Sequence, residues 1–360
     1  MTSFHHNLNH CASQFTSDDI LHLFANDKSS FLSNLKPHPI LSDNHCLHNL
    51  GQTDTNLSLG SRVARQTNLL DNLVNYYTCS HCKYLSRLMD YKQTPLGTPF
   101  DIHWSELAEG TAIVLPKSTT SPLPLSTELS LAWYLEHLFE NFNWSPIIKH
   151  YTAFVCKNTG YLLTEYCPPL LQQIVGDPTM VYDILCQLFA ILSKLLPYNF
   201  SHGATIDSLV LSDKPCEYMY NGKVVKSDQT LKFKNFHDSS ITLENGQKLG
   251  PMVRPPKYFH LTNPTTMETL KVFIPNNSTK HIAFDAYCFI LGLASHPSIY
   301  QEIINNSKLT CWWNGLWFPD DKLKITRNLG KEMDGKSITA SLVGLKLRSD
   351  IVAFSCQQLK

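Results

Sequence analysis

The sharpest metal-ligand pattern in this 360-residue chain is the cysteine pair of the segment Cys79-Ser-His-Cys82. Two thiolates separated by two residues are the usual half of a tetrahedral zinc site. Cysteine and histidine side chains that could complete such a site lie upstream, at Cys46, His48, Cys11 and His10. A second pair with the same spacing is absent from the sequence. Two interpretations therefore stay open: a zinc site in the N-terminal part, or two ordinary thiols at the start of a helix.

Motifs of other common chemistries are missing. The sequence contains no His-Glu-x-x-His, no Gly-x-Ser-x-Gly and no Walker sequence, which are the signatures of zinc proteases, α/β-hydrolases and P-loop nucleotidases. The sixteen histidines are mostly isolated or lie in the polar N-terminal part. These three enzyme classes are therefore not expected.

Composition limits the class of protein further. The 30 basic and 30 acidic side chains cancel, so no net field favours nucleic acid or an anionic membrane as a partner. The first residues show no secretory signal, and no run of about 18 apolar residues lacks charge, so no membrane span is expected. Eleven cysteines are scattered along the chain, as expected for reduced thiols in a cytosolic compartment. A soluble, globular protein is the expected class.

Periodicity and turn residues indicate the elements that would position functional groups. A short apolar strand is expected over Thr111–Lys117, followed by a helix from a cap at Ser126 or Thr127 to about Phe142. Two further strands are expected at Thr152–Cys156 and Gly160–Glu165, and a buried helix at Val181–Leu196. A hairpin is expected about the Asn221-Gly222 turn, and an aromatic core cluster at Cys311–Phe318.

Three segments in a fixed order carry the strongest signal. They are Tyr161–Cys167 (YLLTEYC), His202–Leu211 (HGATIDSLVL) and Leu231–Phe236 (LKFKNF). Protein kinases have four features in this order: a strand running into a hinge, a helix, a loop that begins with histidine, and a strand ending near Asp-Phe-Gly. Over roughly residues 95 to 300 the chain resembles a protein kinase. The hairpin between the last two segments makes it similar to serine/threonine kinase-like proteins of large nucleocytoplasmic DNA viruses.

The resemblance implies an α+β, two-lobed protein kinase-like fold. Residues 1–88 would form an N-terminal extension, 89–168 the N-lobe and 169–360 the C-lobe. Asp285, in a segment similar to the helix start of kinases that follows Asp-Phe-Gly, would cap the backbone of the His202 loop. The resemblance thus places the loop, the hinge and Asp285 around one site.

The same resemblance implies that catalytic groups have been lost. Aligning His202 with the motif histidine puts Ala204 at the catalytic aspartate, Leu209 at the metal-binding asparagine and Asn235 at the aspartate of Asp-Phe-Gly. Alanine cannot orient a hydroxyl, and leucine and asparagine supply little to hold Mg²⁺. Losing one such group costs on the order of 10² to 10⁴ in rate. A pseudokinase with no catalytic residue is expected; Asp207 and Asp238 are the fallback acids of an atypical active kinase.

A nucleotide could still bind through the remaining parts of the site. Its cofactor-binding residues would be a remnant of the glycine-rich loop, the strand lysine, a helix glutamate that pairs with it, and the hinge backbone: Gly97, Lys117, Glu128, Glu165 and Cys167. Glu136 competes with Glu128 for the ion pair, and Glu128 is favoured because it shares an inward-facing stripe with Leu131, Leu135 and Phe139. No cofactor is required; ATP without Mg²⁺, and zinc in the extension, are the candidates.

The expected function is binding rather than phosphoryl transfer. The chain would be a catalytically inactive scaffold for protein partners, such as virion or host proteins, in the host cytoplasm or the virion. Two alternatives stay open: an atypical active serine/threonine kinase that uses displaced acids, and a virion structural protein that retains a kinase scaffold.

Overall fold

The computed structural model describes residues 100–104, 108–117, 125–139, 144–156, 159–203, 205–242, 248–249, 256–262, 269–275, 281–319 and 342–359. These residues form an α+β protein that divides into two compact units. Unit 1 holds the described residues up to 138 and 147–167; unit 2 holds 139–146 and the described residues from 168 onward. The predicted N-terminal extension with Cys79 and Cys82, the loop remnant Gly97, and Ala204 lie outside the described residues.

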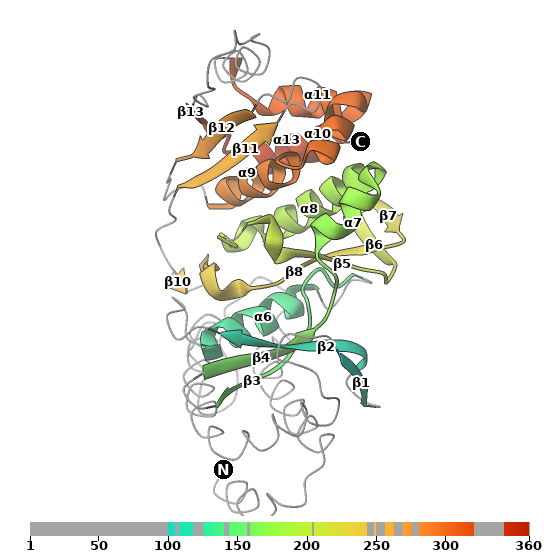
Figure 1. Ribbon diagram of the computed structural model, residues 1–360, viewed down its shortest axis with the longest axis vertical. Coiled ribbons are helices and arrows are strands. Elements are labelled where there is room, and N and C mark those ends of the chain that lie inside the picture. Colours follow the sequence, from blue (N-terminus) through green and yellow to red (C-terminus); the bar gives the residue numbers. More distant parts are fainter. Residues whose placement is uncertain are drawn as a thin grey trace, which may run out of the picture. The chain divides into compact units, whose positions relative to one another are not determined.

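Unit 1 is a four-stranded antiparallel sheet with one helix (Figure 1). The strand order is β1-β2-β4-β3, and the element bounds are β1 Phe100–Trp104, β2 Ala108–Lys117, β3 His150–Cys156, β4 Thr159–Glu165 and α6 Leu125–Phe139. The strand predictions agree with β2, β3 and β4. The predicted helix start was wrong, because α6 already includes Leu125; the predicted end near Phe142 lies outside the described residues, and α6 is described as far as Phe139. Ser126 and Thr127 therefore lie in its first turn rather than at its cap.

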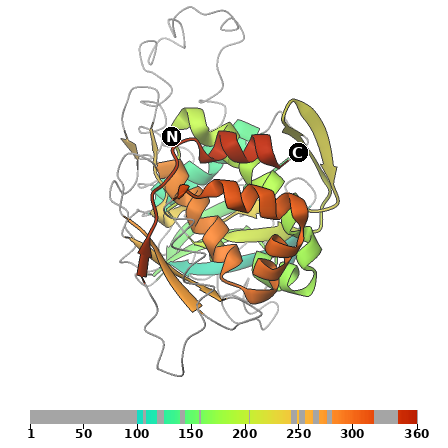
Figure 2. The same cartoon turned by 90° about the horizontal axis from the view of Figure 1, so that it is seen from above.

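Unit 2 is mainly helical (Figures 1 and 2). Its α-helices are α7 Leu170–Gly176, α8 Val181–Leu195, α9 His281–Ala294, α10 Pro297–Asn305, α11 Ser307–Leu316 and α13 Ile351–Gln358. Short 3-10 turns lie at Pro178–Met180, Leu196–Tyr198, Ile206–Ser208 and Phe236–Asp238. Helix α8 matches the prediction over Val181–Leu196 within one residue, and eleven of its fifteen side chains are buried. It is the apolar centre of the unit.

Helix α8 also has the length and composition of a membrane span. Together with its flanking turns it forms the helical stretch Pro178–Tyr198, and 61% of its most apolar window is buried inside the protein. Helices α9 and α10 pass the same test as a pair, across a bend of 101°. The core helices of soluble proteins also pass this test, and burial of this extent is typical of such a core helix.

The strands of unit 2 form small separate sheets. Strand β5 (Leu209–Ser212) pairs with β8 (Thr230–Phe233), β6 (Cys216–Tyr220) with β7 (Lys223–Ser227), and β9 (Ile241–Thr242) with β10 (Lys248–Leu249), all antiparallel. A three-stranded sheet contains β11 (Lys257–Thr262), β12 (Thr269–Ile274) and β13 (Leu342–Gly344), with β13 parallel to β12. The predicted hairpin turn at Asn221-Gly222 is confirmed, and both residues have positive φ angles, 52° and 72°, as a two-residue turn of type I′ requires.

A polar network fixes the β6–β7 hairpin on helix α8. The fully buried amide of Gln187 donates to the Asp183 carboxylate at 2.9 Å and accepts from the backbone N–H of Leu231 at 2.9 Å. Asp183 also accepts from the hydroxyls of Tyr218 and Ser227, at 3.0 and 2.6 Å. Burial and the Asp183 charge both raise the pKa of Tyr218 above its ordinary value. The hairpin is therefore held on one side, and Figure 2 shows it standing out from the helices.

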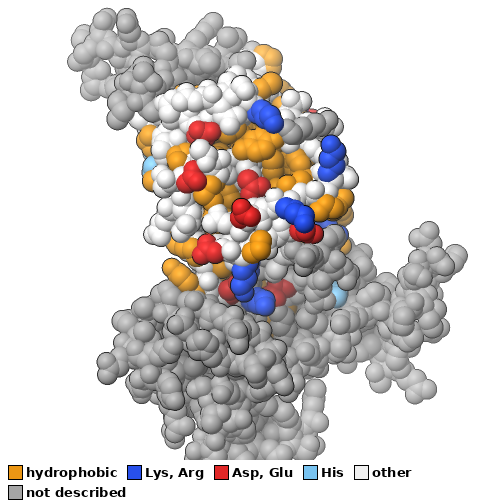
Figure 3. Space-filling view, turned by 90° about the vertical axis from the view of Figure 1, so that its right-hand side faces the viewer, with side chains coloured by type: hydrophobic (Ala, Val, Ile, Leu, Met, Phe, Trp, Pro, Cys, Tyr) orange, Lys and Arg blue, Asp and Glu red, His pale blue; other side chains and the backbone are white. Residues whose placement is uncertain are grey.

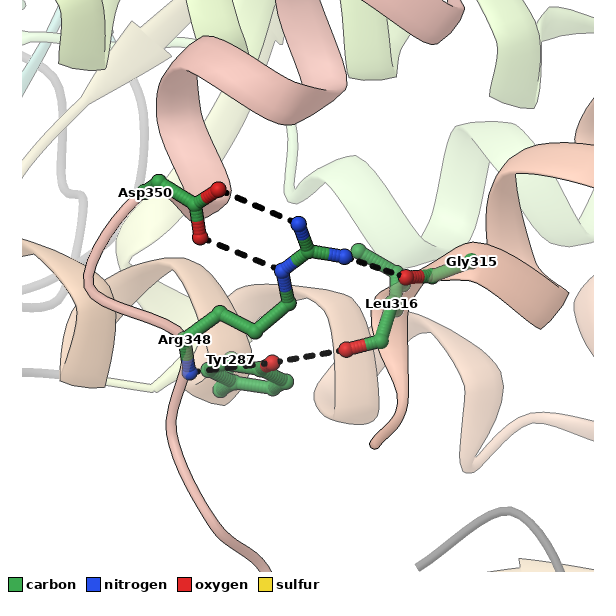
Figure 4. Close-up of polar contacts among 5 residues, drawn as sticks. All are labelled: Tyr287, Gly315, Leu316, Arg348 and Asp350. Carbon is green, nitrogen blue, oxygen red and sulfur yellow. Dashed lines mark hydrogen bonds and ion pairs between the residues drawn. The ribbon is translucent and has the colours of Figure 1, made fainter. Parts of the chain in front are cut away.

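The C-terminal helix is clamped onto unit 2 by Arg348 (Figure 4). Its guanidinium donates to both oxygens of Asp350 at 3.1 Å and to the Gly315 carbonyl at 2.6 Å. The Tyr287 hydroxyl donates to the carbonyl of Leu316 at 3.0 Å. The end of α11 and the start of α13 are thus joined by charge-assisted hydrogen bonds.

One face of the described part mixes all side-chain types. Figure 3 shows hydrophobic side chains interspersed with Asp, Glu, Lys and Arg on one face of the described part. Within the described ranges, the exposed large hydrophobic residues are spread over several elements: Val175, Leu196, Met219, Val224 and Tyr258. Among the described residues, no group of three or more His, Cys, Asp and Glu side chains could hold a metal ion.

Candidate functional site

The loop that follows α8 is pinned by one buried carboxylate. Asp285, in the second turn of α9, is fully buried and accepts hydrogen bonds from the backbone N–H of His202 at 2.5 Å and of Gly203 at 2.9 Å. Gly203 has a φ of 73°, a conformation that glycine adopts without strain. The predicted capping of this loop by Asp285 is confirmed, although the residues are more than 80 positions apart in the sequence.

The side chain of His202 forms the centre of an aromatic cluster. It is fully buried, and its ring centroid lies 5.3 to 6.2 Å from those of Phe200, Phe233, Phe236 and Phe289. These rings come from the loop itself, from β8 and the turn after it, and from α9. The histidine therefore joins three separate segments of unit 2 through ring packing rather than facing solvent.

The segment around Asn235 is fastened to the same loop. The strand register places Leu209 opposite Phe233, and the N–H of Lys234 donates to the Ser208 carbonyl at 2.9 Å. Two residues beyond the Asn235 turn, Ser239 donates its hydroxyl to the His202 carbonyl at 3.0 Å. Asn235 itself is in the left-handed conformation, with a φ of 60°. Unit 2 thus brings together three of the predicted segments: the His202 loop, Asn235–His237 and Asp285.

The two acids predicted as fallbacks, Asp207 and Asp238, lie in separate turns. Asp207 is exposed and accepts from the Thr205 hydroxyl at 3.4 Å. Asp238 lies 3.3 Å from the His237 ring nitrogen, and both side chains are more than a third exposed. Leu209 is fully buried in β5. Asp207 is therefore exposed in the turn before β5 and Asp238 half-buried in the turn after β8, and the positions Leu209 and Asn235 carry no charge.

Unit 1 contains the predicted hinge strand. Thr164 and Glu165 end β4, and Cys167 follows two residues later, all three largely buried. The Glu165 carboxylate accepts from the backbone N–H of Lys149 at 3.2 Å, and its own N–H donates to the Lys149 carbonyl at 2.8 Å. The side chain and the backbone N–H of Glu165 therefore both hold the start of β3.

The two candidate glutamates of α6 both turn inward. Glu128 is 1% exposed, as its place on the apolar stripe predicts. Glu136 accepts from the backbone N–H of His150 at 3.0 Å, and the neighbouring Trp133 donates its ring N–H to the His150 carbonyl at 2.7 Å. Lys117 ends β2, opposite Gly160 of β4; its side chain lies outside the described residues. Glu136 is thus occupied in fixing β3, which leaves Glu128 as the candidate for Lys117.

Sequence reasoning missed two supports of the site. Ser239, which holds the His202 carbonyl, and Ser201, whose backbone pairs with that of Ser240, carry no pattern that separates them from surface serines. Gln187 could have been recognised as a buried hydrogen-bonding residue. It is polar, it lies one turn after Asp183 within the apolar helix α8, and buried amides need several partners.

Comparisons with known proteins add little to these geometric observations. No family model matches the chain, and no curated protein matches it. Among 96 matching chains of solved structures is a crystal structure of a kinase domain, with 11% sequence identity and a TM-score of 0.23. The match covers 37% of this chain and 45% of the kinase chain. A likeness of this extent carries no argument about activity, substrate or partner.

Proposed function

We propose that the chain is a catalytically inactive, kinase-like protein that acts by binding protein partners. The observation that carries the proposal is the pair of hydrogen bonds that the Asp285 carboxylate accepts from the backbone N–H groups of His202 and Gly203. A buried charge is retained only when it is well paired. The Asp285 carboxylate stabilises the backbone of a loop in which the positions assigned to catalysis by the resemblance carry uncharged side chains.

The uncharged positions support inactivity. A phosphoryl-transfer site needs carboxylates that hold Mg²⁺ against the phosphates, whereas Leu209 is a buried hydrocarbon and Asn235 a neutral amide. Asp207, which is exposed, and Asp238, which is half-buried, belong to turns with partners of their own, Thr205 and His237. In this proposal the loop has a structural rather than a catalytic role. The resemblance to viral kinase-like proteins makes virion or host proteins the proposed partners.

Magnesium is expected to add nothing to the effect of ATP on thermal stability. A ligand at 100 times its dissociation constant stabilises by about 2.7 kcal/mol, which raises the melting temperature by several degrees in a domain of this size. Thermal-shift measurements with ATP plus EDTA and with ATP plus Mg²⁺ should give equal melting temperatures. A further rise of several degrees with Mg²⁺ would overturn the proposal. Phosphate transfer abolished by Asp207→Asn and Asp238→Asn would establish the active-kinase alternative.

Glu128→Gln and Glu136→Gln are expected to differ in their effect on ATP. If Glu128 orients Lys117 toward the phosphates, its neutralisation should reduce the ATP-induced rise in melting temperature. Glu136→Gln keeps an acceptor for the His150 N–H and should leave that rise unchanged. An equal response of both variants, measured against their own ligand-free melting temperatures, would reject Glu128 as the partner of Lys117.

A further inference from the structure

The β11–β12 sheet presents an aromatic and basic outer face. Side chains alternate along both strands: Phe259, Leu261, Leu270, Val272 and Ile274 are buried, on the side where helices α9 and α10 lie (Figures 1 and 2). The opposite face carries Tyr258, which is 53% exposed, and the exposed His260. Because a strand turns successive side chains to opposite faces, the cross-strand residues Lys271 and Phe273 belong to this same outer face.

The outer-face side chains are arranged as a stack. The rings of Tyr258 and Phe273 lie opposite each other, with centroids 6.1 Å apart and planes inclined by 32°. The ammonium group of Lys271 lies 5.0 Å from the centre of the Tyr258 ring. At the far end of the face, the hydroxyls of Thr262 and Thr269 are 3.0 Å apart. The face thus offers π surface, one placed cation and hydroxyl groups.

The charge on these two strands has one sign. Strands β11 and β12 contain Lys257 and Lys271 and no acidic residue; by alternation Lys271 lies on the outer face and Lys257 on the side of Phe259. The total charge of the chain is zero, whereas these two strands are basic. An anionic ligand would therefore complement the charge of the outer face. Aromatic rings beside a basic side chain on an exposed sheet are the combination on which the bases and phosphates of single-stranded nucleic acid bind.

From this geometry we propose that the outer face of β11 and β12, defined by Tyr258, His260, Lys271 and Phe273, binds a short stretch of single-stranded nucleic acid. Tyr258 and Phe273 stack on bases, and Lys271 contacts a phosphate. A strand of six residues is about 20 Å long, which limits the contact to a few nucleotides. Binding is therefore weak, in the range of about 10⁻⁴ to 10⁻⁶ M typical of contacts without sequence preference.

The test is fluorescence anisotropy of the full chain with labelled twelve-nucleotide oligothymidylate and oligouridylate. Tyr258→Leu keeps apolar volume but removes the π face, and it should weaken binding by about 5-fold or more, since stacking contributes roughly 1 to 3 kcal/mol per base. Lys271→Gln should lower the slope of log affinity against log salt by about 0.7, the share of one phosphate contact. Circular dichroism would establish that both variants fold.

The matched control is Val224→Ala on the exposed strand β7, a residue 62% exposed and outside this face, which should bind as the unaltered chain does. Absence of oligonucleotide binding, or binding that Tyr258→Leu leaves unchanged, would overturn the proposal. Competition by polyglutamate that depends on Lys271 but not on Tyr258 would also overturn it, because the face would then recognise acidic protein segments.

Discussion

Replacing Asp285 by alanine is expected to lower the free energy of unfolding of unit 2 by about 3 to 5 kcal/mol. The carboxylate is fully buried and accepts from two backbone N–H groups, and hydrogen bonds to charged groups contribute roughly 1.5 to 3 kcal/mol each. Its removal leaves the amides of His202 and Gly203 buried without this acceptor. A loss of this size is a large part of the 5 to 15 kcal/mol typical of domains.

Urea denaturation followed by circular dichroism would measure the loss. Asp285→Asn retains one acceptor oxygen and should fall between the alanine variant and the unaltered chain. Asp207→Ala is the matched control, since it removes an exposed carboxylate from the same loop, where only a 3.4 Å contact with Thr205 is made, and should change stability by less than about 0.5 kcal/mol. Equal denaturation midpoints for Asp285→Ala and Asp207→Ala would contradict the proposed role of the cap.

Truncation after Asp350, which removes helix α13, is expected to abolish cooperative unfolding of unit 2. Ile351, Val352 and Leu359 are almost completely buried, and burial of each contributes roughly 1.5 to 3 kcal/mol. Ser355 of this helix accepts two hydrogen bonds. Its hydroxyl accepts from the ring N–H of Trp312 at 3.0 Å, and its carbonyl accepts from the Tyr220 hydroxyl at 3.1 Å. Truncation would leave these donors without their acceptors beside an opened apolar core.

Differential scanning calorimetry would report the change as loss of the sharp transition of unit 2. The control is the double variant Gln357→Ala and Gln358→Ala, which alters the exposed side of α13 and should leave the transition in place. A truncated chain that still melts with the original enthalpy would show that α13 is not part of the cooperative unit.

The sequence predicted elements whose signals are local. Helix α8 was found because apolar residues occur nearly all round it, and the β6–β7 hairpin because Asn221-Gly222 suits two positive φ angles. The aromatic residues Trp312, Trp313 and Trp317 are buried, as predicted for the cluster Cys311–Phe318. Asp285 was placed by motif order, and its contact with His202 spans 83 residues.

Long-range pairings without a motif could not be predicted. Strand β13 joins β12 in parallel across about 70 residues, through Lys271 opposite Leu342, and three residues carry too little alternation to reveal such a pairing. The bracing of Lys149 by Glu165 was missed for a different reason: a carboxylate that accepts from a backbone N–H has the same sequence signature as a solvated one. Helix ends such as Leu125 depend on capping geometry that sequence defines only within a few residues.

The left-handed backbone at Asn235 has an evolutionary consequence. Asparagine and aspartate are the non-glycine residues that most readily adopt this conformation, and their side chains are nearly isosteric. Exchange of one for the other therefore alters charge while the polypeptide path is conserved. Replacement of Asn235 by aspartate in the course of evolution would therefore meet no steric barrier and would add one negative charge to the turn.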